Sequence, residues 1–319
     1  MNRVATVLQK QGALVALGLL VILATARYET FATPENVLNV LRQNSMGGLI
    51  AIGMTFVILS GGIDLSVGAL VAVGGALAAE MSGYGSAAAI GVAVLATAVL
   101  GAINGLVVTR ARVQPFITTL AMMFAARGLL LVHTHEQSVR VDRSAEVLVW
   151  LGRGWIGPIP VPVVLLFAAF ALAWFVLEHT RFGRHVFAVG DSDDAARLMG
   201  LDVERVRLGV YIVSGILAGF AGVMLAARLG TGQPVAGAGW ELNAITAVVV
   251  GGTLLSGGHG NVMQTLVGVL LLGFILNVFN LEGTISSYWQ WVLRGVFLLV
   301  VVVIQNRLGA RVAAGTSHG

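Results

Sequence analysis

Two long stretches without a charged side chain constrain this chain more than any other feature. Residues 87–109 and 242–281 contain no Asp, Glu, Lys or Arg. A helix on the surface of a soluble protein needs a polar face, whereas a helix that crosses a bilayer needs about 20 mostly apolar residues in succession. Over all 319 residues, 57% are hydrophobic and 11% are charged, which is too little polar surface for a water-soluble fold. We therefore expect an integral membrane protein, and the soluble enzyme classes are excluded.

Apolar runs of spanning length occur at ten places. They are residues 11–26, 45–62, 65–82, 87–109, 114–133, 161–178, 208–228, 242–257, 262–280 and 287–305. The second uncharged stretch is too long for one crossing, and glycines and an asparagine between residues 256 and 261 divide it, because these residues favour turns. No small-residue cleavage site follows the first run, so we interpret it as a retained span. The sequence predicts an all-α polytopic membrane protein, a single domain over residues 1–319, with about ten transmembrane helices and interrupted or re-entrant segments.

The distribution of basic residues predicts which segments face the cytoplasm. With ten spans and the amino terminus inside, eleven Lys and Arg fall inside, five fall outside, and the other three of the 19 lie in or at the edge of spans. Cytoplasmic loops carry the excess of positive charge, so this arrangement is the favoured one. It places both termini and residues 179–207 in the cytoplasm, and residues 133–162 outside.

The inner segment is predicted to contain a short helix. Asp191 or Ser192 can cap it, acidic residues occupy its first turn, and Gly200 can end it. Leu198 and Met199 share a face with the alanine at position 195. So short a helix is marginal in water, which indicates that it packs either on its own membrane domain or on a cytoplasmic partner.

The outer segment carries several charges, among them Arg140, Arg143 and Arg153. It is either a solvated loop or a docking surface on which these charges steer a soluble partner. His133 and His135 at its start have no accompanying ligand set, so no metal site is predicted there.

Asp64 is the most unusual residue in the apolar part of the sequence. It follows Gly61 and Gly62 between two apolar runs, so it either caps the third span or lines a pathway through the membrane. Residues 59–62, Leu-Ser-Gly-Gly, recur at residues 255–258 in a matching place between two later spans. Both stretches predict interruptions of the helices, and such backbone is tolerated at membrane depth only where it is buried in protein or lines water.

Nucleotide hydrolysis by this chain is excluded on its motifs. A phosphate-binding loop needs a lysine after its glycines, and the only lysine of the chain, Lys10, is followed by Gln11. Cysteine is absent, so disulfides and thiolate metal sites are excluded as well.

Four stretches resemble the ABC-transporter permeases for monosaccharides such as ribose, xylose and arabinose. They are residues 53–68, which end in Gly-Gly-Ile-Asp-Leu-Ser-Val-Gly, residues 112–120, residues 180–184 with 195–201, and residues 239–245 with 251–253. The similarity runs from the first span to Arg307. Within the family, residues 252–258 and 283–289 are most similar to the galactofuranose permeases.

This resemblance implies a permease subunit, not an enzyme, of an ATP-driven importer of a galactofuranose or pentose-like sugar in the bacterial inner membrane. A second permease chain, identical or paralogous, would complete the pathway, and a soluble periplasmic sugar-binding protein would dock on Arg140, Arg143 and Arg153. A cytoplasmic ATPase would hold ATP and Mg, whereas this chain would bind neither a cofactor nor nucleic acid. The residues expected to couple to the ATPase are Asp191, Asp194, Ala195, Arg197, Leu198, Met199 and Gly200.

The pathway residues implied by the resemblance are mostly side chains to which a neutral polyol could form hydrogen bonds, together with one phenylalanine that could stack or gate. They are Asn44, Ser60, Asp64, Ser66, Asn104, Gln114, Phe116, Thr118, Asn243 and Asn277. The alternative is a proton- or sodium-coupled secondary transporter of a sugar or drug. It would use Asp64, Glu80 or Glu241 as the titrating or ion-binding group. A channel is disfavoured because no filter motif or ring of charges is present.

Overall fold

The structure, a computed structural model, describes residues 3–283 together with residues 289, 292, 295, 296 and 299. Helices account for most of these residues. The helices are α1 (Arg3–Arg27), α2 (Pro34–Leu59), α3 (Val67–Met81), the 3-10 helix η1 (Ser82–Tyr84), α4 (Ser86–Thr109), α5 (Pro115–Thr134), α6 (Glu146–Arg153), α7 (Val161–His179), α8 (Arg181–Asp191), α9 (Asp193–Leu198), α10 (Val203–Leu229), α11 (Trp240–Val250) and α12 (Val262–Glu282). The strands are β1 (Val139–Arg140), β2 (Trp155–Ile156), β3 (Ile159–Pro160) and β4 (Thr231–Gly232). The predicted all-helical class is confirmed.

Six of the described helices are long and apolar enough to cross a membrane: residues 67–84, α4, α5, α7, α10 and α12. Residues 12–27 of α1 and the whole of α11 are shorter apolar helices. The predicted tenth span, residues 287–305, lies for the most part outside the described residues. The count of about ten helices therefore stays a prediction.

The predicted eighth span is wrong in its extent. Residues 242–257 do not form one helix, because α11 has 11 residues and ends at Val250. At 1.5 Å per residue it is about 16 Å long, roughly half the thickness of the hydrocarbon core. Gly252 and Gly257 follow with φ of 92° and 89°, a backbone conformation that leaves the helical path. An interrupted segment of this kind was predicted, but its boundary was not.

Helix α10 is the centre of one group of helices, in which it packs against α4, α3 and α2. It begins where the carboxylate of Asp202 accepts a hydrogen bond from the backbone N–H of Arg205 at 3.0 Å, and it ends at Gly230 in the left-handed conformation. Gly215, Gly219 and Gly222 allow close approach, since a Cβ at any of them would overlap atoms of α3 or α4. Close packing through small residues is typical of membrane helices.

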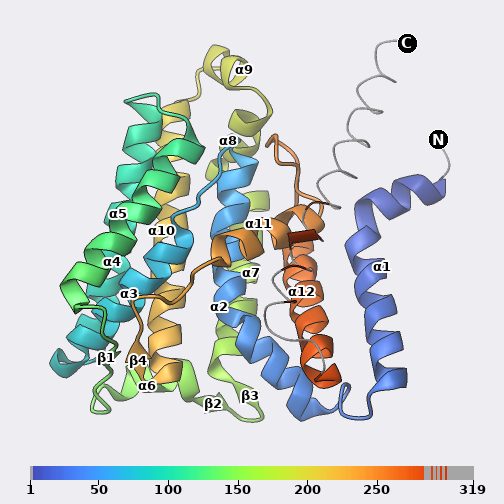
Figure 1. The fold of residues 1–319 in the computed structure, drawn as a ribbon. Helices are drawn as coiled ribbons and strands as arrows, with labels where there is room; N and C mark the ends of the chain where they lie inside the picture. The colour runs from blue at the N-terminus through green and yellow to red at the C-terminus, as the bar shows by residue number, and fades with distance from the viewer. Residues whose placement is uncertain (1–2, 284–288, 290–291, 293–294, 297–298, 300–319) are drawn as a thin grey trace.

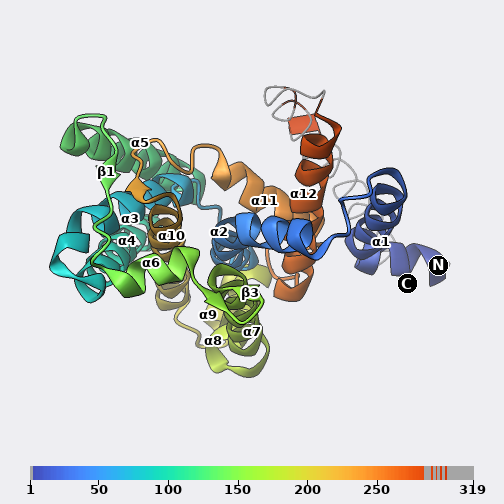
Figure 2. The same ribbon diagram turned by 90° about the horizontal axis from the view of Figure 1, so that it is seen from below.

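Helix α2 joins this group to a second group formed by α11, α12 and α1 (Figure 2). It also packs against α7, and residues 48–59 of α2 are buried without a break. This part of α2 is therefore covered by other helices on all sides and does not face lipid.

The two segments that were predicted to face opposite sides of the membrane lie at opposite ends of the molecule. In Figure 1, α8 and α9 are at the upper end, and α6 with the four short strands is at the lower end. There β1 pairs with β4 and β2 pairs with β3, both antiparallel. The Arg3 end of α1 lies at the same end as α9.

Candidate functional site

A cavity of about 500 Å³ lies between α2, α11 and α12 and is named the central cavity below. Its lining brings together three of the predicted pathway residues, Asn44, Asn243 and Asn277, from three separate helices. The polar lining also includes Gln43, Thr246 and Asn280, and the aromatic lining is Trp240 and Phe279. Pockets of this size bind small molecules when a few polar groups converge on an apolar wall.

Neighbouring groups hold two of these amides in place. The Nδ2 of Asn44 donates to the carbonyl of Val40 at 2.8 Å and lies directly over Gly273, where a Cβ would collide with it. Asn277 exchanges two hydrogen bonds with Asn36, of 3.0 and 2.9 Å, so each amide fixes the orientation of the other. Among the described lining residues none is charged.

Sequence reasoning missed Gln43, Trp240, Thr246 and Asn280. Trp240 stands inside the motif at residues 239–245, next to the predicted pathway residue Asn243, so the motif itself could have indicated it. Thr246 lies three residues after Asn243 on α11, and Asn280 lies three residues after Asn277 on α12. The i, i+3 spacing that puts such pairs on one helix face could have identified both.

Asp64 lies away from the central cavity, in a buried cluster of side chains. Its Oδ1 accepts hydrogen bonds from the backbone N–H and the hydroxyl of Ser66, at 2.9 and 2.6 Å, and its Oδ2 accepts from the hydroxyl of Ser214 at 2.8 Å. The Nδ2 of Asn104 donates to the Ser66 hydroxyl at 2.9 Å. Ser66, not Asp64, occupies the residue position before α3. A buried carboxylate with three donors is well satisfied, so the cluster joins α3, α4 and α10.

The other predicted pathway residues lie elsewhere. Ser60 is buried at the end of α2 and donates to the carbonyl of Val57 at 2.8 Å. Thr118 is buried on α5, Gln114 precedes that helix, and Phe116 on its first turn is 52% exposed. None of these lines the central cavity. Of the groups proposed for ion coupling, Glu80 pairs with His133 at 3.0 Å, and Glu241 accepts from the backbone N–H of Gly239.

The short helix predicted in the inner segment is present as α9. The hydroxyl of Ser192 accepts from the backbone N–H of Ala195 at 3.3 Å and caps it, and Gly200 ends it with φ of 78°. Ala196 is the side chain that packs on the protein, whereas Leu198 and Met199 are 90% and 66% exposed. The predicted apolar face therefore points away from the domain.

Ion pairs hold α9 against the start of α10. Arg207 donates to Asp193 at 2.8 Å, and Arg197 lies 3.8 Å from Glu204. Asp194 and Ala195 are exposed beside Leu198. The helix thus has a fixed position while its outward surface is open.

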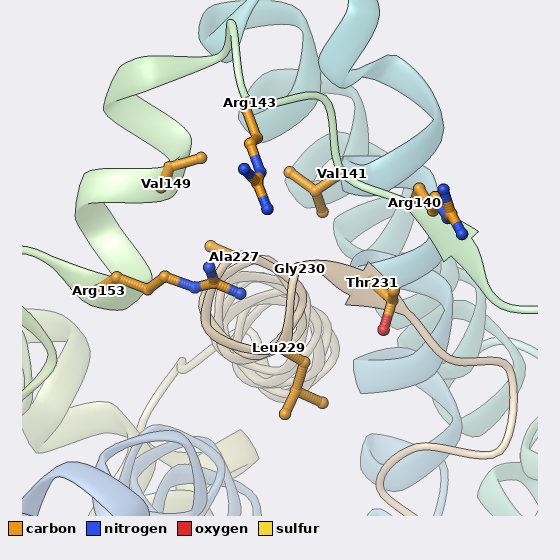
Figure 3. A pocket seen from close by; sticks show the side chains of 9 residues that line it. All are labelled: Arg140, Val141, Arg143, Val149, Arg153, Ala227, Leu229, Gly230 and Thr231. Carbon is orange, nitrogen blue, oxygen red and sulfur yellow. The ribbon is translucent and has the colours of Figure 1, made fainter.

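A second cavity, of about 740 Å³, lies at the opposite end of the molecule and is named the outer cavity. Arg140, Arg143 and Arg153 all line it, together with the carboxyl end of α10. Figure 3 shows Arg143 and Arg153 reaching toward that helix end, with Arg140 further along the neighbouring strand. Among the contacts of the described residues, Arg153 alone of the three is fixed there, through a hydrogen bond of 2.8 Å from its Nε to the carbonyl of Arg228. Cations at a helix carboxyl end are favourable.

The arginines at the two ends of the molecule differ in whether a carboxylate accompanies them. Among the described residues, no carboxylate lies within ion-pair distance of the three arginines of the outer cavity, whereas Arg197, Arg205 and Arg207 at the α9 end each have one. Asp142, the acid next to Arg143, is engaged by the backbone N–H of Ser144 at 2.8 Å. This hydrogen bond stabilises the ionised form and lowers the pKa of Asp142 from its ordinary value.

A family model described as "Branched-chain amino acid transport system / permease component" matches residues 36–302. The chain belongs to this family. The ribose import permease protein RbsC of Escherichia coli K12 is 41% identical over 304 residues, which cover 94% of each chain. RbsC of Bacillus subtilis strain 168 is 44% identical over 306 residues and 95% of each chain. The L-arabinose ABC transporter permease protein AraH of Azospirillum brasilense is 36% identical, over 86% of this chain and 81% of its own. No solved structure matched.

The permease family agrees with the resemblance found in the motifs, which is thereby confirmed. The relatives are named as permease proteins of sugar ABC transporters, so this permease is a membrane subunit of a transporter rather than an enzyme. The named relatives are bacterial, and the chain has several apolar helices, so it is a multi-pass protein of a bacterial inner membrane. The comparisons favour this reading over an ion-coupled secondary transporter.

Proposed function

We propose that this permease forms the pathway of an ATP-driven importer for a neutral monosaccharide and that the sugar passes through the central cavity. The lining of that cavity carries the proposal. It offers carboxamides and a hydroxyl from three helices, an indole ring, and no charged side chain among the described residues. Carboxamides and hydroxyls both donate and accept hydrogen bonds, which suits the hydroxyls of a sugar.

The same lining argues against a branched-chain amino acid, the substrate in the name of the family. A zwitterion carries an ammonium and a carboxylate, and taking either out of water without a partner costs several kcal/mol. Asn44, Asn243 and Asn277 offer neutral groups only. The named substrates of the relatives, ribose and L-arabinose, are neutral pentoses, in agreement with this chemistry. The motif at residues 252–258 adds galactofuranose as a candidate.

A second permease chain, identical or paralogous, would face this one and complete the pathway. ATP and Mg would be held by a separate cytoplasmic ATPase, because this chain lacks the lysine of a phosphate-binding loop. We place α9 on that ATPase. Leu198 and Met199 expose a compact apolar surface on a helix that two ion pairs attach to α10, which suits insertion into a partner.

The outer cavity would receive the periplasmic sugar-binding protein. Arg140 and Arg143 are free of carboxylate partners among the described residues. An acidic surface can therefore pair with them without breaking an existing ion pair. With this end outside, α9 and the Arg3 end of α1 face the cytoplasm, in agreement with the distribution of basic residues. The predicted cytoplasmic carboxy terminus lies outside the described residues.

The test is an uptake panel. The permease is reconstituted in proteoliposomes with its cognate ATPase and binding protein, with ATP inside, and radiolabelled D-ribose, L-arabinose, galactofuranose and L-leucine are compared. We expect ATP-dependent accumulation of one or more of the sugars and none of leucine. Accumulation of leucine alone would contradict the assignment of the central cavity to a sugar.

A further inference from the structure

Three glycine-containing segments meet at the α9 end of the molecule. They are residues 59–61 at the end of α2, residues 190–191 at the end of α8, and residues 257–258 in the connection between α11 and α12. The backbone N–H of Gly258 donates to the carbonyl of Leu59 at 3.0 Å. The two Leu-Ser-Gly-Gly stretches noted in the sequence are therefore brought into contact with each other. We name this three-way contact the glycine clasp.

The clasp is a contact of backbone on backbone. A Cβ at Gly190 would collide with the carbonyl oxygen of Leu59 and lie 2.6 Å from the N–H nitrogen of Gly258. A Cβ at Gly257 would lie 2.9 Å from both the Gly190 carbonyl oxygen and the Gly61 nitrogen. No flexible side chain lies between the segments at these points, so none of them can shift without pushing its neighbours.

One side of the clasp leads to α9. Asp191 is the last residue of α8, and Ser192 caps α9 directly after it. Arg207 forms a second connection between the clasp and α9. Its guanidinium pairs with Asp193 of α9 and lies 3.9 Å from the position that a Cβ on Gly61 would take.

The other side leads to the central cavity. The segment that contains Gly257 and Gly258 connects α11 with α12, and these helices carry Trp240, Asn243 and Asn277 of the lining. The clasp is thus the point at which the helix before α9 touches the connection of the two helices that hold the proposed sugar contacts.

We propose that the glycine clasp transmits the movement of α9 to α11 and α12 as one rigid unit. Gly190 keeps the three segments in contact, because its missing side chain lets the end of α8 reach the carbonyl of Leu59. The proposal rests on the docking of α9 to the ATPase and adds how that docking reaches the cavity. Packed contacts of this kind carry displacement because they do not deform continuously.

The first test is Gly190→Ala in the reconstituted complex. Gly190 does not have a positive φ, so alanine is not strained by the backbone and acts only by pressing the segments apart. The matched controls are Gly91→Ala and Gly128→Ala, in which a Cβ meets nothing within 4 Å. We expect Gly190→Ala to keep the ATPase on pull-down and to keep hydrolysis, and to lose most sugar uptake. Uptake equal to that of the controls would overturn the proposal, and so would loss of the ATPase, since the clasp would then serve assembly.

The second test does not depend on that variant. The natural chain has no cysteine, so Asp191→Cys and His259→Cys, whose native side chains lie 4.0 Å apart, form a unique pair. A short bis-methanethiosulfonate reagent crosslinks the pair, and a reductant releases it, so each preparation is its own reference. Uptake by the reduced pair is the reference, and a rigid unit predicts that crosslinking leaves this uptake unchanged. A reduced pair without uptake would show that the side chain of Asp191 or His259, and not the backbone contact, transmits the movement, and would also overturn the proposal. Uptake that stops on crosslinking and returns on reduction would show that the segments separate in each cycle and would overturn the proposal. If the unsubstituted complex shows no ATP-driven uptake, the proposed function fails instead.

Discussion

The hydroxyl of Ser214 on α10 donates a hydrogen bond of 2.8 Å to the Oδ2 of Asp64, a residue 150 positions earlier in the chain. The other carboxylate oxygen is occupied by two donors from Ser66. Asp64 was predicted either to cap the third span or to line a pathway. Its position in a buried cluster, away from the central cavity, indicates that it fixes the break between α2 and α3 against α10.

The Asp64 cluster predicts opposite outcomes for two substitutions. Asn keeps an oxygen that accepts from Ser66, and its amide can donate to the Ser214 hydroxyl, which is able to accept. Leu leaves three buried donors without an acceptor, at about 1–3 kcal/mol for each. We expect Asp64→Asn to keep most of the thermal stability of the permease in detergent and Asp64→Leu to lose much of it. Equal melting temperatures for the two variants would contradict this role.

The exposed surface of α9 predicts where the ATPase binds. Leu198→Glu puts a carboxylate into a groove that is expected to be apolar, at a cost of several kcal/mol when it is left unpaired. The permease should insert normally, since the side chain is 90% exposed in the free chain, but lose the ATPase on pull-down. Leu198→Met is the matched control and should retain it. Retention of the ATPase by the glutamate variant would place the docking site elsewhere.

The outer cavity predicts a salt-dependent association with the binding protein. Arg143 is the better site to change, because Arg153 also holds the carbonyl of Arg228 and its loss would disturb α10. Arg143→Glu should slow association, and the difference from the unsubstituted permease should shrink at high salt as charges are screened. Association rates at two salt concentrations measure this. The control is Arg110→Glu. Arg110 directly follows α4 and does not line the outer cavity, so this change should leave the association rate unaltered.

The central cavity predicts which asparagine matters for the sugar. Asn243 has no intramolecular hydrogen bond from its side chain among the described residues, whereas Asn277 is paired with Asn36. Replacing Asn243 with alanine should remove one neutral hydrogen bond to the sugar, worth about 0.5–1.5 kcal/mol, and reduce uptake by about two- to tenfold. Gln137→Ala, an exposed amide in the outer segment, is the control. Unchanged uptake for Asn243→Ala would remove this residue from the pathway.

The sequence predicted most of the long helices because apolar length is a local property that each span carries by itself. It predicted the all-α class and a short inner helix capped by Asp191 or Ser192 and ended by Gly200 for the same reason, and the structure has that helix at Asp193–Leu198. It missed the end of α11 because residues 251–257 are as free of charge as the helix before them. The break there depends on Gly251 and Gly252 packing against Gln264 of α12, and such a contact is tertiary.

The candidate site was predicted in part for a similar reason. Polar residues within apolar helices were predicted to line the pathway, and Asn44, Asn243 and Asn277 do lie around one cavity. Asn104 and Asp64 are polar residues of the same kind, yet both form a hydrogen bond with the hydroxyl of Ser66 in the interior. Which polar residue faces a cavity and which is satisfied by a distant helix is decided by packing between segments far apart in the chain.

The most direct test of the account is what energy drives uptake. Proteoliposomes containing the full complex, with the binding protein outside, are supplied either with internal ATP or with an imposed proton gradient and no ATP. An ATP-driven permease should accumulate sugar with ATP and none with the gradient alone, and Asp64→Asn should keep substantial ATP-driven uptake. Accumulation driven by the gradient without ATP, and abolished in Asp64→Asn, would contradict this assignment and support the ion-coupled transporter.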